Sequence, residues 1–262
     1  MTTTVPRDEV AHESGGTGRL ALRGAGAGLL GGVVLAMVVM VVMGLAGQGF
    51  WSPVNLGIPA FVTTVAPPLT MLPALLRAMG VALPASAMGP LGSAIASGHL
   101  SSAMAQQLGA QLESMHVPAS TVAPMGQLMT GHATNATVST LLSTMSPRAR
   151  DAVMAAMPVS GGRVVLGLML HMMMSAALGA AFFLVIVALR RRGLGVVRGT
   201  GGVIGAGVLG GAVVYAVMRW VLLPPTNSMM AFVPQWAFFA AHLMFGLVVG
   251  ALLARTMVTR PA

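Results

Sequence analysis

The sequence contains no cysteine and no lysine, and it has few charged residues of either sign. The lack of cysteine excludes a disulfide, a thiolate metal site and a cysteine nucleophile. Charged residues make up 7% of the chain, whereas soluble domains carry roughly 25%. Hydrophobic residues make up 56%. This composition suits a chain whose main solvent is lipid, and it predicts an all-α integral membrane protein.

Acidic side chains are scarce, and they lie outside the apolar segments of the chain, at Asp8, Glu9, Glu13, Glu113 and Asp151. A proton relay or sodium site built on carboxylates within the membrane is therefore not expected. All 14 basic residues are arginine, and most flank apolar segments, which favours membrane orientation over nucleic-acid binding. The sequence has no HExxH motif, P-loop or Ser-His-Asp candidate. We therefore predict that the protein is not an enzyme.

Apolar segments long enough to span a membrane occur at residues 24–46, 164–189, 199–223 and 236–254. The segments richest in arginine are a tail at 1–23, a loop at 190–198 and a second tail at 255–262. The positive-inside rule places these three in the cytoplasm, with both termini inside. The 224–235 loop and residues 47–163 then lie outside. Arginine without lysine, together with abundant Ala, Gly and Val, suggests a GC-rich bacterium. We therefore expect the protein in a bacterial inner membrane.

The long segment 47–163 is predicted to be an extracytoplasmic or interfacial insert with short amphipathic helices. Apolar residues recur every three or four positions from Leu100 to Met115, and again from Val138 to Met145. Ser146-Pro147 is typical of an N-cap followed by proline at the first helical position. A third short helix is therefore expected after Ser146.

The apolar helices carry an internal repeat. The runs that begin at His171 and His242 both read His-x-Met-x-small-x-x-x-Gly-Ala. Upstream, Leu30-Gly31-Gly32 matches Leu209-Gly210-Gly211, and Pro53-x-Asn55 matches Pro225-x-Asn227. The order suggests two parallel copies of a two-helix unit, each with one histidine at the same depth. We therefore predict a four-helix bundle built from two pseudo-repeats.

Small residues follow each histidine at helical spacing. Ser175 and Gly179 share the face of His171, and Gly246 and Gly250 share the face of His242. Small residues four positions apart let helix backbones approach closely in lipid. The pairs that we expect to pack in this way include Gly28/Gly32, Gly201/Gly205 and Gly207/Gly211. The small residues beside each histidine leave room for either a partner helix or a flat ligand.

Three roles remain open for His171 and His242. Each imidazole can hydrogen-bond a hydroxyl or carbonyl of a neighbouring helix and hold the bundle together. Alternatively, the two rings can ligate one haem b iron, or take part in a copper site with methionine, since thioethers suit Cu(I). The candidate ligands for copper, besides these histidines, are Met173, Met244, Met115, His116, Met129 and His132.

The order of Gly-rich helix, Pro-x-Asn, His-bearing helix, Leu-Pro-Pro and second His-bearing helix resembles small bacterial four-helix inner-membrane proteins. The resemblance covers roughly residues 24–55 and 164–254. It implies a multi-pass protein in the lipid bilayer. We expect a non-enzymatic accessory or assembly subunit that contacts other membrane subunits. A haem or copper carrier is the first alternative, and a small-solute transporter is the second.

Overall fold

The computed structural model describes residues 7–56, 73, 76–77, 80, 89, 91–93, 100–130, 135–148, 150–151, 159–197, 199–223 and 233–258. These residues are predominantly helical, and none of them is in a strand. The Pro225-x-Asn227 half of the predicted repeat and His132 lie outside the described residues.

Four of the described helices are long and apolar enough to cross a membrane, as expected for a multi-pass membrane protein. They are α1 (Arg7–Leu45), α9 (Gly161–Arg191), α10 (Thr200–Val217) and α12 (Gln235–Val258). A π-helical turn, η3 (Met218–Leu222), continues α10, and a short 3-10 turn, η2 (Gly195–Val197), precedes it. The stretches that qualify as spans are Gly18–Leu45, Gly161–Arg191, Thr200–Leu222 and Gln235–Thr256.

The first helix begins at Arg7, although residues 1–23 were expected to form a polar tail. Residues 8–23 contain no proline, so nothing interrupts the backbone hydrogen-bond ladder before the apolar run begins. The hydropathy pattern marks only where a helix becomes apolar. It does not mark where the helix starts, because the first turns of α1 carry charged residues and precede the apolar run.

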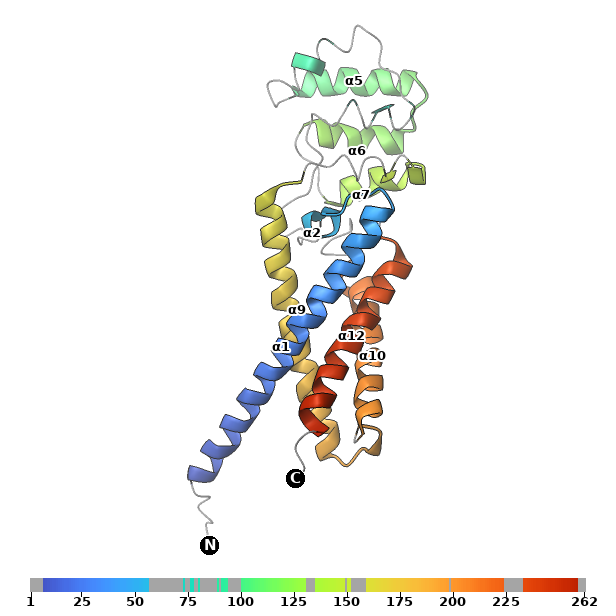
Figure 1. Cartoon of the computed structure of the whole chain (residues 1–262). Coiled ribbons are helices and arrows are strands. Elements are labelled where there is room, and N and C mark those ends of the chain that lie inside the picture. Colours follow the sequence, from blue (N-terminus) through green and yellow to red (C-terminus); the bar gives the residue numbers. More distant parts are fainter. Residues whose placement is uncertain are drawn as a thin grey trace. The chain divides into compact units, whose positions relative to one another are not determined.

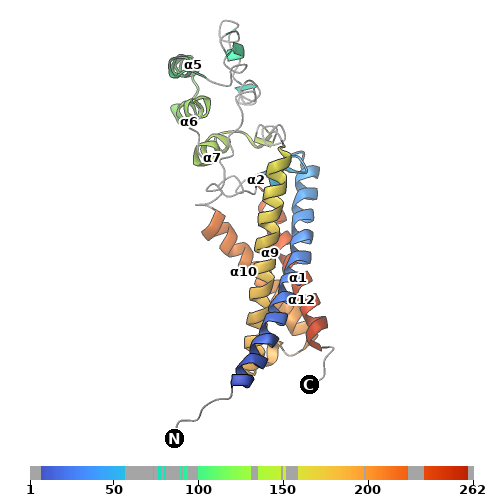
Figure 2. The same cartoon turned by 90° about the vertical axis from the view of Figure 1, so that its left-hand side faces the viewer.

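The chain divides into two compact units. The first comprises Met1–Val39, Leu168–Trp220 and Pro234–Ala262, and it contains most of the apolar helices (Figures 1 and 2). Within it, α1 is antiparallel to α9 and α10 is antiparallel to α12, as their glycine contacts show. Its buried core includes Phe183, Ile186, Phe245, Val249 and Leu253.

The second unit comprises Met40–Gly167 and Val221–Val233. Its described helices are α2 (Ser52–Leu56), α5 (Ser102–Ser114), α6 (Ala119–Met129) and α7 (Asn135–Ser143). Figures 1 and 2 show α5, α6 and α7 stacked in succession. Each contributes buried apolar side chains, which include Leu112 of α5, Met125 and Met129 of α6, and Leu141 and Leu142 of α7.

Two of these helices correspond to predicted amphipathic segments, and the other two, α2 and α6, were not predicted. The pattern from Leu100 to Met115 contains α5, which begins after the N-cap Ser101. The pattern from Val138 to Met145 overlaps α7. The longer of the two missed helices, α6, contains Pro124, a residue that disfavours helix interiors. Burial of its Val122, Met125 and Met129 side chains stabilises the helix despite the proline.

The third expected helix is described only in part. Pro147, Arg148, Arg150 and Asp151 are helical, and residues 152–158 lie outside the described residues. Asp151 accepts a hydrogen bond from Gln48 Nε2 at 2.6 Å. This bond joins the turn after α1 to the start of that helix within the second unit.

Candidate functional site

The His171 side chain of α9 contacts the backbone of α1. Its Nε2 atom lies 2.9 Å from the Gly32 carbonyl oxygen. Because a carbonyl oxygen can only accept, Nε2 carries a proton and donates this bond. The glycine at position 32 is needed for Ser175, because a Cβ atom there would lie 2.6 Å from the Ser175 Cβ, whereas its 3.6 Å distance from Nε2 is an ordinary contact.

The second histidine makes a different bond. His242 of α12 places Nδ1 2.7 Å from the carbonyl oxygen of Phe238, one turn earlier in its own helix. The ring is buried, and it meets Phe238 edge-on with ring centroids 4.4 Å apart. The expected bond to a neighbouring helix is thus made by His171, whereas His242 satisfies its Nδ1 within α12.

Aromatic packing accounts for the orientation of the His242 ring. Tyr215, the only tyrosine in the chain, is buried on α10 and meets the rings of Phe238, Phe239 and His242. The centroids of the Tyr215 and His242 rings are 6.0 Å apart. Sequence reasoning missed Tyr215. The available signal was its spacing of four residues from Gly211, which places the two on one helical face.

Both rings face neighbouring helices of the first unit. His242 is buried against Tyr215 of α10, and the half-buried His171 contacts α1. This placement agrees with the high cost of a histidine that faces lipid.

Close contact between α1 and α9 depends on small residues. A Cβ atom at Gly28 would overlap the Ser175 carbonyl oxygen and lie 2.9 Å from Gly179 Cα. At Gly179, an added Cβ atom would lie 2.5 Å from Gly28 Cα and also overlap the Gly24 carbonyl oxygen. The two backbones are thus in direct contact along this face, and any side chain larger than hydrogen would separate them.

The contact between α10 and α12 follows the same order of residues. A Cβ atom at Gly207 would overlap the Gly246 carbonyl oxygen and lie 2.8 Å from Gly250 Cα. A Cβ atom at Gly211 would overlap the His242 carbonyl oxygen. Gly246 and Gly250 stand at the same spacing from His242 as Ser175 and Gly179 from His171.

Another predicted glycine pair is not packed in this way. A Cβ atom at Gly201 or Gly205 would meet no atom within 4 Å, and both glycines are exposed. They lie on a different face of α10 from Gly207 and Gly211, because a spacing of two residues between Gly205 and Gly207 turns the helix by roughly 200°. The prediction that Gly201 and Gly205 pack closely against another helix of the chain is therefore wrong.

These contacts decide how well a haem would fit. The small residues beside the histidines were compatible with either a partner helix or a flat macrocycle. In the structure, Gly28 covers Gly179, and Gly207 covers Gly246. The backbone of the paired helix occupies the space that a macrocycle would need beside these residues. The arrangement therefore does not fit a haem placed over the small-residue faces.

The methionines proposed as copper ligands do not gather around the histidines. Met173 and Met244 are exposed, whereas Met129 is buried with Met125 in the core of the second unit. Met115 is half-buried, and His116 is exposed with a positive φ of 63°. Within the described residues, no group of three or more His, Asp or Glu side chains is arranged to hold a metal ion.

No protein-family model matches the sequence, and comparisons with curated proteins and with solved structures found no match.

Proposed function

We propose that this chain is a non-enzymatic integral membrane protein that acts as an accessory or assembly subunit of a larger membrane complex. The observation that supports this proposal is the use made of the polar and small residues in the apolar helices. His171 and His242 each bond a backbone carbonyl, and the glycines beside them contact backbone of the paired helix. These residues serve the packing of the bundle.

The exposed surface of the apolar helices offers a place for another membrane subunit to bind. On α10, Leu209, Val213 and Val217 are exposed at helical spacing, and they form one apolar stripe. Such a stripe suits lipid or the apolar helix of another membrane subunit. The second unit adds short helices with their own buried core, and we propose that it lies outside the cytoplasm as a contact domain.

Site-specific photo-crosslinking tests the subunit role in native membranes. A photoreactive amino acid at the exposed Leu209 should give one discrete protein adduct whose yield drops when the membranes are solubilised in harsh detergent. The matched control is the same amino acid at Val203, which is buried in the core of the same helix and should crosslink within the chain. Adducts with lipid alone at Leu209 would contradict the proposal for this face.

The orientation can be tested cleanly because the chain has no cysteine. We propose that the termini and the 190–198 loop are cytoplasmic, in a bacterial inner membrane. A membrane-impermeant maleimide should label Val159→Cys in spheroplasts with the outer face open, and it should label Leu194→Cys only after permeabilisation. Both side chains are exposed. The reverse labelling pattern would invert the proposed topology.

Cofactor content separates the packing role from the carrier alternatives. The protein purified in mild detergent should show no Soret band, whether oxidised or reduced with dithionite, and it should contain no stoichiometric copper. A Soret band or bound copper that disappears in both His171→Ala and His242→Ala would make the histidines ligands and overturn the packing role. Solute flux into liposomes containing the purified protein would instead favour a transporter.

A further inference from the structure

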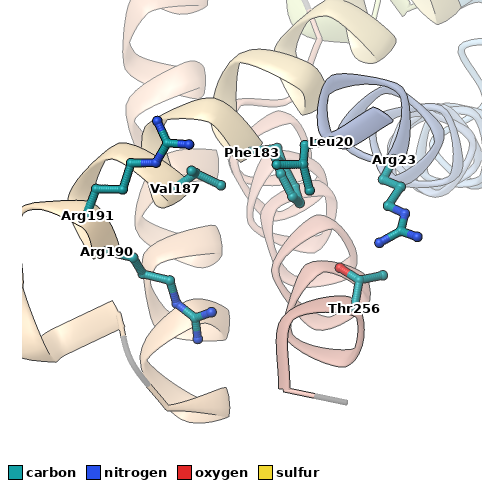
Figure 3. A pocket seen from close by; sticks show the side chains of 7 residues that line it. All are labelled: Leu20, Arg23, Phe183, Val187, Arg190, Arg191 and Thr256. Atoms are coloured by element: carbon teal, nitrogen blue, oxygen red, sulfur yellow. The ribbon is translucent and has the colours of Figure 1, made fainter. Parts of the chain in front are cut away.

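A cavity with three arginines opens at one end of the apolar helix bundle. Its volume is about 280 Å³, and its walls include Arg23 of α1 together with Arg190 and Arg191 of α9. Figure 3 shows Arg23 on one side of the cavity and the two α9 arginines on the other. Among the side chains that the structure describes, no acidic residue lines it. The cavity therefore offers concentrated positive charge to an anion.

Most of the remaining wall is apolar. Leu20, Phe183 and Val187 lie between the arginines in Figure 3, and Phe183 is almost fully buried. The hydroxyl of Thr256 on α12 adds a polar group beside Arg23. A ligand that fills this cavity thus needs a negatively charged group next to hydrocarbon, which describes the head of an anionic lipid better than a soluble ion.

The depth of the cavity agrees with that chemistry. Arg190, Arg191 and Thr256 occupy the final turns of their candidate spans, and Arg23 lies within two turns of the start of Gly18–Leu45. Because α1 is antiparallel to α9 and to α12, these positions meet at the same end of the bundle. Lipid phosphates lie at this level, where apolar helices leave the hydrocarbon.

Close packing fixes the positions of the two helices that carry the arginines. Gly24 follows Arg23, and a Cβ atom at Gly24 would lie 2.7 Å from both the Gly179 carbonyl oxygen and Phe183 Cβ. This contact sets the spacing between α1 and α9 directly beside the cavity. On α9, Arg190 donates from Nε to the Val197 carbonyl oxygen at 2.8 Å, which orients its guanidinium. Arg190 is thus oriented by a hydrogen bond, whereas Arg23 and Arg191 are exposed side chains on helices whose spacing is fixed beside the cavity.

We infer that this cavity binds the phosphate head group of an anionic phospholipid. Arginine guanidinium groups bind phosphate oxygens through paired, charge-assisted hydrogen bonds. A volume of about 280 Å³ lies just below the roughly 300–1,000 Å³ of sites that enclose whole small molecules. The cavity therefore takes the head group, and the acyl chains run along the exposed apolar faces of α1 and α9.

Native mass spectrometry of the detergent-purified protein tests the inference, with phosphatidylglycerol as probe and zwitterionic phosphatidylcholine as reference. The test variant is the double substitution Arg23→Gln/Arg191→Gln. The matched control is Arg19→Gln/Arg192→Gln, which removes the same charge from exposed neighbours that do not line the cavity. We expect the test variant to bind phosphatidylglycerol about 30-fold more weakly and the control to bind it almost as well as the parent.

Equal weakening in both double variants would mean that net charge alone attracts the lipid, and it would overturn the site. Inorganic phosphate provides the arm for a soluble anion: phosphate that displaces phosphatidylglycerol at comparable concentration would overturn the lipid assignment. If the test variant fails to fold, as judged by circular dichroism, the single substitutions should each weaken binding by about fivefold. Unchanged binding in both single variants would again refute the site.

Discussion

The glycine contacts predict a difference between glycines that lie only one turn or less apart in the same helix. On α1, Gly28 faces α9, whereas a Cβ atom at Gly26 would meet no atom within 4 Å. We therefore expect Gly28→Ala to destabilise the bundle and Gly26→Ala to leave it unchanged or slightly more stable. The same methyl group is added to the same helix in both variants, so their difference reports the packing alone.

The expected loss of stability in Gly28→Ala follows from the distances between α1 and α9. A Cβ atom at Gly28 would lie 2.9 Å from Gly179 Cα, whereas carbon atoms attract best at roughly 3.5–4.0 Å. The helices must therefore separate by at least about 0.6 Å, and overpacking of this kind costs typically about 1–3 kcal/mol. The higher helix propensity of alanine, about 1 kcal/mol at most, is gained equally at both positions and cancels in the comparison.

The assay is thermal unfolding in mild detergent, followed by circular dichroism. For a chain of this size, we expect the Tm of Gly28→Ala to fall below that of Gly26→Ala by about 2–12 °C. On α10, Gly207→Ala and its exposed counterpart Gly205→Ala should differ in the same direction. A Tm for Gly28→Ala equal to or above that of Gly26→Ala would refute the proposed role of direct backbone contact.

Three further substitutions test contacts in both units. His171→Ala removes the bond to the α1 backbone and should cost about 1–2 kcal/mol in detergent unfolding, while His171→Gln should recover part of the loss; equal Tm values for the two would contradict a hydrogen-bonding role. Ser101→Ala removes the N-cap of α5 and should cost about 1 kcal/mol, seen as faster amide exchange in α5, whereas the exposed Ser102→Ala should exchange at the parental rate. Gln48→Ala removes a 2.6 Å bond to Asp151 and should cost about 1.5–3 kcal/mol; trypsin should then cleave more rapidly near Asp151, and an unchanged cleavage rate would count against that bond.

Hydropathy alone was sufficient to predict four apolar helices, because a chain in lipid must satisfy its backbone polar groups within each span. The four helices in the structure occupy the four apolar stretches. Periodicity also located α5 and α7, since each buries one apolar face. It missed α6, where proline weakens the local signal and burial of Met125 and Met129 outweighs it.

Local spacing was insufficient to predict which polar and small residues meet. The sequence presents Gly201/Gly205 and Gly207/Gly211 as equivalent pairs, yet only the second pair is covered, because the rotation of α10 about its axis depends on its neighbours. The partner of His242 is likewise a tertiary property. Tyr215 and Phe238 orient its ring toward the carbonyl one turn back, and no local pattern specifies that arrangement.

For the arginines, too, the sequence predicts one property and the tertiary structure decides another. Their positions beside apolar runs are a property of the sequence, and these positions are sufficient to predict an orientation in the membrane. The meeting of Arg23 with Arg190 and Arg191 around one cavity joins residues far apart in the chain. It depends on the close, antiparallel packing of α1 and α9 through Gly24, Gly28 and Gly179. The sequence by itself therefore determined the class of protein and the number of its apolar helices. Only the tertiary structure decided which side chains converge, because convergence depends on how the helices rotate and pack against one another.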